Sequence, residues 1–80
     1  MLDKKLLDYA IKGVAAEIDT LEKDINRGKQ YLLQYERGEK PKTSKSEYEI
    51  HDIIKEKKAE IEKLAAYKDD LKWKLVDFEQ

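Results

Sequence analysis

The sequence has no cysteine, which excludes disulfide bonds and thiolate metal sites and makes a reducing compartment the natural expectation. Its single histidine, His51, excludes a two-histidine metal site within one chain. Long apolar runs are also absent, and the first residues enter a mixed apolar and charged pattern. We therefore expect no signal peptide, no membrane span and a cytoplasmic location.

Helix-breaking residues are scarce, with one proline and three glycines among 80 residues. Charged residues make up 44% of the chain and hydrophobic residues 40%, a balance typical of long helices and coiled coils. Disorder is the competing interpretation, but the apolar residues are too numerous and too periodic for it. A core of this size is marginal, so the sequence favours a partner or self-association. An excess of lysine over arginine indicates a bacterial or phage genome.

Apolar positions recur in alternating four- and three-residue steps along two stretches, which is the heptad pattern of packed helices. We call the two sets the seams. The first seam is Leu7, Ile11, Val14, Ile18, Leu21, Ile25, Gly28, Leu32 and Tyr35, and the second is Ile50, Ile54, Lys57, Ile61, Leu64, Lys68, Leu71, Leu75 and Phe78. Between them, Gly38 and Pro41 predict a loop. The sequence thus predicts one all-α domain over 1–80, with a helix over 2–37, a loop over 38–45 and a helix over 46–79.

The two seams share one register. Folding the chain about Pro41 pairs positions whose numbers sum to 82, so that Leu21 meets Ile61 and Leu7 meets Leu75. This agreement predicts a two-helix antiparallel coiled-coil hairpin. Helices of about 35 residues would form a rod about 50 Å long, at 1.5 Å rise per residue.

Three seam positions do not carry apolar side chains. Gly28 would face Ile54, and we expect the missing side chain to accommodate the isoleucine; the alternative is a helix break at 26–28, because glycine costs about 1 kcal/mol in a helix. Lys57 and Lys68 are expected to lay their methylene stems along the seam and extend their ammonium groups to water.

The start of the second helix has two candidate capping boxes, Ser44 with Glu47 and Ser46 with Glu49. In either one, the serine oxygen and the glutamate would bind backbone N–H groups left free at the helix start. The sequence does not distinguish between the two frames.

A surplus apolar stripe lies opposite the seams, where a lone hairpin should be polar. It consists of Leu2, Leu6, Tyr9, Gly13, Ala16 and Thr20 on the first helix and Ala66, Trp73 and Val76 on the second. The register places Trp73 level with Tyr9. Such a surface is typical of association, and we predict a homodimer in which two hairpins form a four-helix bundle. A foreign protein partner and ordinary surface are the alternatives.

The predicted loop end is basic, since residues 23–45 carry seven basic and three acidic side chains. The side chains that could contact nucleic acid are Arg27, Lys29, Arg37, Lys40, Lys42 and Lys45, with Tyr31, Tyr35 or Tyr48 available for stacking if exposed. We favour a solvated loop instead, with Tyr35 and Tyr48 closing the last core layer, because nearby glutamates dilute the positive charge.

No constellation of residues indicates catalysis, a metal or a cofactor. Glu47 and His51, four residues apart on one helix face, are a thin basis for a metal site, and the glycines form no phosphate-binding loop. We therefore expect no enzyme, but a small accessory, adaptor or inhibitor-type protein that binds a protein partner helix on helix. The alternatives are a nucleic-acid-binding hairpin that uses the basic tip, and a structural scaffolding protein.

Overall fold

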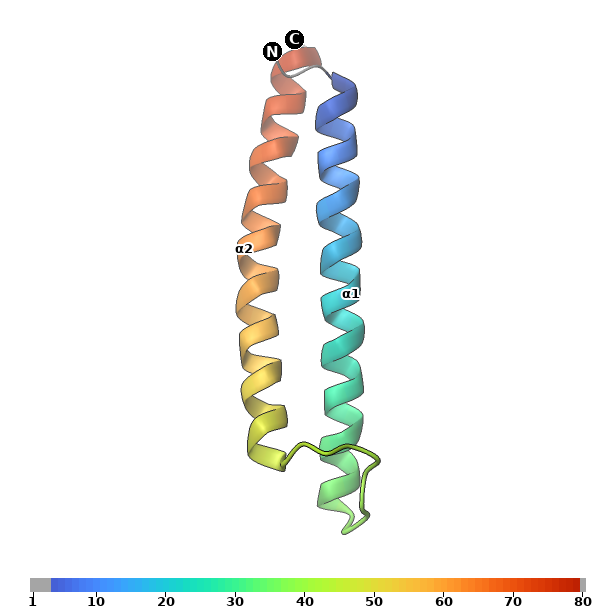
Figure 1. The fold of residues 1–80 in the computed structure, drawn as a ribbon. Coiled ribbons are helices and arrows are strands. Elements are labelled where there is room, and N and C mark those ends of the chain that lie inside the picture. Colours follow the sequence, from blue (N-terminus) through green and yellow to red (C-terminus); the bar gives the residue numbers. More distant parts are fainter. Residues whose placement is uncertain (1–3, 80) are drawn as a thin grey trace.

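The computed structural model describes residues 4–79, which form two helices, α1 (Lys4–Glu36) and α2 (Glu47–Glu79). Figure 1 shows them side by side and antiparallel, with the start of α1 and the end of α2 at the same end of the rod. The molecule measures 57 × 17 × 16 Å, and its radius of gyration is 17.4 Å. A compact protein of this length would have a radius of gyration of about 12 Å. The expectation of an all-helical hairpin is confirmed, and no strand occurs within residues 4–79.

The core is the line of contact between the helices. Its buried residues are Leu7, Val14, Leu21, Ile25, Ile50, Ile54 and Leu71. Seven buried residues are few for a whole domain. Half-buried neighbours such as Ile18, Leu32 and Leu64 pack against six of them and form two clusters. All of the first seam and all of the second except Phe78 are buried or half-buried. The heptad pattern therefore identified the packed faces correctly.

Gly28 and Ile54 meet as the register predicts. A Cβ atom built on Gly28 would lie 3.1 Å from both Cδ1 and Cγ1 of Ile54. Helix α1 continues through this position without a break. The glycine therefore makes room for a bulky partner, and the alternative of a break at 26–28 is wrong.

Two seam residues depart from the expected packing. Phe78 is 49% exposed, because the register places it level with Lys4 and not with an apolar side chain. Lys57 does not extend its ammonium group freely to water, because its Nζ lies 3.1 Å from Oδ2 of Asp24 on α1. Lys68 is half-buried at its seam position, in keeping with a stem laid along the core.

The two tyrosines near the loop, Tyr35 and Tyr48, have different environments. Tyr35 is half-buried, and its hydroxyl donates a hydrogen bond to the carbonyl oxygen of Lys45 at 2.8 Å. Tyr48 is 86% exposed, so the expectation that it helps to close the last core layer is wrong. The reason is local: Tyr48 lies two residues before the buried Ile50, which turns it away from the seam.

Helix α1 ends in a left-handed glycine cap. Gly38 has a φ of 75°, and its N–H donates to the carbonyl oxygen of Tyr35. The N–H of Glu39 donates to Gln34 at 2.9 Å, which completes a Schellman motif. Beyond it, the loop turns back beside α1, with Pro41 buried, and crosses to the start of α2 (Figure 1).

Helix α2 begins with the second of the two capping boxes. The N–H of Glu49 donates to Oγ of Ser46 at 3.2 Å, and the N–H of Ser46 donates to Oε2 of Glu49 at 3.3 Å. Ser46 is therefore the N-cap, and the helix proper starts one residue after the predicted position 46. Glu47 and Glu49 also place negative charge in the first turn, where the helix dipole favours it.

Candidate functional site

The surplus stripe of α1 is exposed to solvent along its whole described length. Its members there are Leu6, Tyr9, Gly13, Ala16 and Thr20; Leu2, which was also predicted to belong, lies outside the described residues. Tyr9 is the largest of the five and is 70% exposed. We call these five residues the α1 stripe. It is a narrow, mostly apolar strip about four helical turns long.

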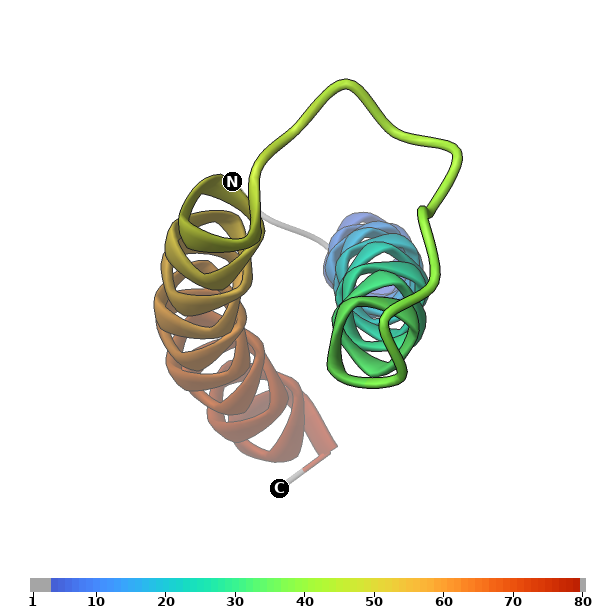
Figure 2. The same ribbon diagram turned by 90° about the horizontal axis from the view of Figure 1, so that it is seen from below.

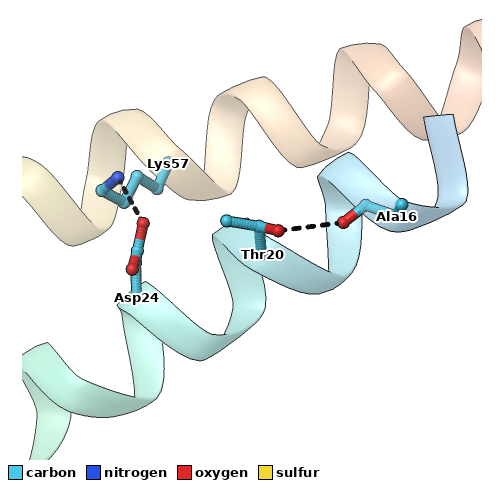
Figure 3. Close-up of polar contacts among 4 residues, drawn as sticks. All are labelled: Ala16, Thr20, Asp24 and Lys57. Atoms are coloured by element: carbon cyan, nitrogen blue, oxygen red, sulfur yellow. Dashed lines mark hydrogen bonds and ion pairs between the residues drawn. The ribbon is translucent and has the colours of Figure 1, made fainter. Parts of the chain in front are cut away.

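Hydrogen bonding makes the polar end of this stripe less polar than its sequence suggests. Oγ1 of Thr20 donates to the carbonyl oxygen of Ala16 at 3.1 Å (Figure 3). The hydroxyl is thus used within the helix, which is a common arrangement for threonine in the middle of a helix. A partner would meet Thr20 without having to bind its hydroxyl proton.

The apolar residues of α2 form a separate surface. Trp73 is 69% exposed, and Ala66 and Val76 are exposed as well. Trp73 lies midway between the seam residues Leu71 and Leu75, so it points away from α1. We call Ala66, Trp73 and Val76 the α2 patch.

The α1 stripe and the α2 patch lie on opposite sides of the rod. Tyr9 lies midway between the seam residues Leu7 and Ile11, just as Trp73 does on its own helix, so each side chain points away from the other helix. Tyr9 and Trp73 are level along the rod but do not belong to one surface. A single flat interface therefore cannot use both.

Asp24 and Lys57 form a polar contact between the helices, in the half of the rod nearer the loop. Asp24 extends from α1 toward Lys57 of α2, and the two side chains are both part-buried (Figure 3). By contrast, the ion pair of Lys23 with Asp19 lies on the surface of α1 alone. The Asp24–Lys57 pair therefore helps to fix how the helices face each other, whereas the surface pair contributes little.

The basic residues of the tip are distributed over α1, the loop and the start of α2. All six are exposed, namely Arg27, Lys29, Arg37, Lys40, Lys42 and Lys45. Of the three tyrosines considered for stacking, only Tyr48 presents an open ring, since Tyr31 and Tyr35 are half-buried. The tip thus offers positive charge with one available aromatic side chain.

Features suited to metal binding are not gathered together in the described part of the chain. Glu47 and His51 are both exposed at the start of α2, where they line a shallow depression with Tyr48. Within residues 4–79, no three histidine, aspartate or glutamate side chains are grouped so that they could hold a metal ion.

Two features were not anticipated from the sequence. Leu33 and Tyr67 are exposed apolar side chains outside both seams and outside the predicted stripe. A groove of about 320 Å³ also opens between the helices near the loop. The heptad pattern could have indicated neither, because it reports only which residues face the seam.

Comparison with protein-family models, with curated proteins and with solved structures gives no match for this chain. Neither helix, in the part of the chain that the structure describes, combines the length and the apolar character needed to cross a membrane.

Proposed function

We propose that this protein is a non-enzymatic interaction module that binds helix on helix through the α1 stripe, first of all to a second copy of itself. Tyr9 carries the proposal. A large, amphipathic ring that is 70% exposed within an apolar strip is the type of residue that anchors protein interfaces.

Gly13 gives independent support. A Cβ atom at this position would meet nothing within 4 Å, so the hairpin does not need a glycine there. Glycine nevertheless costs about 1 kcal/mol relative to alanine inside a helix. This cost would be offset if another helix backbone approached closely at Gly13, as small residues allow. Gly28, by contrast, is explained within the hairpin by Ile54.

The shape of the molecule also favours a partner. The chain exposes 6528 Å², whereas a compact monomer of 9.5 kDa exposes about 5,000 Å². Two helices in contact along one line leave most of each cylinder in water. Pairing two hairpins through the α1 stripe would produce a four-helix bundle with the two α1 helices at its centre.

A two-fold symmetric, antiparallel pairing suits the stripe. If the two α1 helices crossed between Gly13 and Ala16, Tyr9 of one copy would lie near Thr20 of the other. Lys12 and Asp19 lie seven residues apart along one edge of the stripe, so in this register Lys12 of one copy would lie within about one helical turn of Asp19 of the other. Such a pairing would bring opposite charges near each other along the edge of the contact.

Sedimentation equilibrium at high micromolar concentration tests the proposal. We expect the wild type to have about twice the monomer mass of 9.5 kDa. Tyr9→Glu should be a monomer with unchanged helicity, because it places a charge in the dimer contact. Trp73→Glu is the matched control, since Trp73 is 69% exposed on the opposite side of the rod. A monomeric wild type would overturn the self-association, and equal disruption by both variants would overturn its assignment to the α1 stripe.

The α2 patch remains available to a further protein in such a dimer. Trp73 is its anchor, and its exposure does not depend on the α1 contact. A partner that binds there should be retained by Tyr9→Glu and lost by Trp73→Ala in pull-down experiments from the native cell. The reverse pattern would assign foreign binding to the α1 stripe and would leave the patch without a role.

A nucleic-acid-binding tip is the second candidate function, and the exposed ring of Tyr48 is the observation that favours it. Binding of RNA or DNA should then weaken steeply between low and physiological salt, and should be lost when Lys40, Lys42 and Lys45 are all changed to Glu. Binding that does not depend on salt concentration, or that is retained after these substitutions, would exclude a nucleic-acid-binding tip. Self-association beyond a dimer would instead favour a scaffolding role.

A further inference from the structure

A groove of about 320 Å³ opens on one side of the rod near the loop. Seen along the rod from the loop end, the loop bows out to one side of the two helices (Figure 2). Loop residues Thr43 and Lys45 line the groove together with residues of both helices. The groove therefore has three walls, formed by α1, α2 and the loop. Its volume is near the lower end of the range for small-molecule sites.

The apolar part of the groove depends on Gly28. Because that residue has no side chain, the isoleucines of α2 approach α1 closely there, and the lining includes Ile50, Ile53 and Ile54. Tyr31 adds an aromatic ring from α1. An alkyl or aryl group in the groove would therefore leave water for a surface of aliphatic and aromatic carbon.

The loop wall is held in place by hydrogen bonds. Tyr35 donates its hydroxyl proton to the carbonyl oxygen of Lys45 at 2.8 Å, which ties the loop to α1. The N–H of Lys45 donates to Oγ1 of Thr43 at 3.2 Å. The backbone position of Lys45 at the edge of the groove is thus set before any ligand arrives, which lowers the entropy lost on binding.

The charges around the groove are unbalanced. Three cationic side chains line it, Arg27, Lys45 and Lys57, against a single carboxylate, Asp24. Asp24 is already paired with Lys57 at 3.1 Å. Within the described residues, neither Arg27 nor Lys45 forms an ion pair, so two positive charges stand beside an apolar lining. That combination is complementary to an anionic head on an apolar body.

We propose that this groove binds a small amphipathic anion, namely a carboxylate or similar monoanionic head on an alkyl or aryl body. The head lies between Arg27 and Lys45, and the body lies over Ile53 and Tyr31. This site uses no residue of the α1 stripe or the α2 patch, so it stands whether or not the protein dimerises.

A titration with octanoate, monitored through the amide and methyl NMR signals of the protein, tests the site. We expect saturable shifts at the Gly28 amide and the Ile53 and Ile54 methyl groups, with none of comparable size at Tyr9 or Trp73. Octanol, which has the same body without the charge, and inorganic phosphate, which has charge without the body, should each bind more weakly by about tenfold or more.

Two variants make the test specific. Lys45→Glu should weaken octanoate by about tenfold or more, because it reverses one of the two unpaired charges. Lys40→Glu is the matched control, an exposed tip lysine that does not line the groove, and it should leave affinity within about twofold. Circular dichroism verifies that both variants keep the fold.

Several outcomes would overturn the proposal. These are the absence of saturable shifts at millimolar octanoate, shifts centred on Tyr9 or Trp73, equal binding of octanol, and equal losses from Lys45→Glu and Lys40→Glu. Ile53→Asp gives a second route, since an acidic group in the apolar wall should abolish octanoate binding. Unchanged binding by that folded variant would also contradict the site.

Discussion

Gly28 of α1 lies so close to Ile54 of α2 that a Cβ atom on the glycine would be 3.1 Å from two carbons of the isoleucine. Gly13, in the same helix, has open space at the corresponding point. Packing within the hairpin therefore explains the glycine at position 28 but not the one at position 13. Substitution by alanine distinguishes the two positions.

Gly13→Ala should stabilise the isolated hairpin by about 1 kcal/mol, because alanine restores helix propensity at no steric cost. Gly28→Ala gains the same propensity but crowds Ile54, so we expect it to be less stable than Gly13→Ala by about 1 kcal/mol or more. Urea unfolding at low protein concentration, where self-association is minimal, measures both. Equal effects of the two substitutions would contradict the close approach at Gly28.

Leu21→Asp tests the middle of the seam. Leu21 is buried, and a carboxylate there would lose its hydration among apolar side chains, so we expect a loss of about 3 kcal/mol or more in the free energy of unfolding. Leu33→Asp is the control, because Leu33 is 48% exposed and should change stability by about 0.5 kcal/mol at most. Thermal melts followed by circular dichroism are sufficient. If Leu21→Asp melted like the wild type, the register would be wrong.

Ser46→Ala tests which serine caps α2. It removes the oxygen that accepts the N–H of Glu49, and the expected cost is about 1 kcal/mol. Ser44→Ala should have almost no effect, because Ser44 lies in the loop before the helix. Denaturant unfolding of the two single variants gives the comparison. A larger loss from Ser44→Ala would place the cap in the other frame.

Tyr35→Phe tests how the loop is held. The variant loses the hydrogen bond to the carbonyl oxygen of Lys45 and keeps the ring, so we expect a cost of about 1 kcal/mol. Tyr48→Phe should be neutral, since Tyr48 is exposed and no hydrogen bond of its hydroxyl occurs among the described residues. Amide hydrogen exchange of the loop should also accelerate in Tyr35→Phe alone. Unchanged exchange there would show that the tether does not order the loop.

Much of the fold could be predicted because it depends on short-range rules. A heptad pattern reports directly which face of a helix is buried, and residues such as Gly38 and Pro41 mark a turn whatever surrounds them. The register followed from matching the two patterns, as the approach of Gly28 to Ile54 confirms. The pattern failed at Phe78, where one helix has an apolar residue and the other has Lys4.

The surfaces could be predicted only in part. Periodicity identified the α1 stripe and the α2 patch as apolar residues outside the seam, and every described member is exposed. Being level along the rod, however, does not say on which side a residue lies. Tyr9 and Trp73 share a level and still face in opposite directions, because each points away from the other helix.

By itself, the sequence determined two amphipathic helices, a turn and the pairing of their apolar faces, because those depend on periodicity and on local backbone preferences. Only the tertiary structure decided that Ser46 caps α2, that Lys57 pairs with Asp24, and that the loop folds to one side to wall a groove beside Gly28. The ion pair and the groove depend on where side chains from separate segments meet in space, and the choice of cap depends on where the backbone enters α2. No periodic pattern along one chain contains that information.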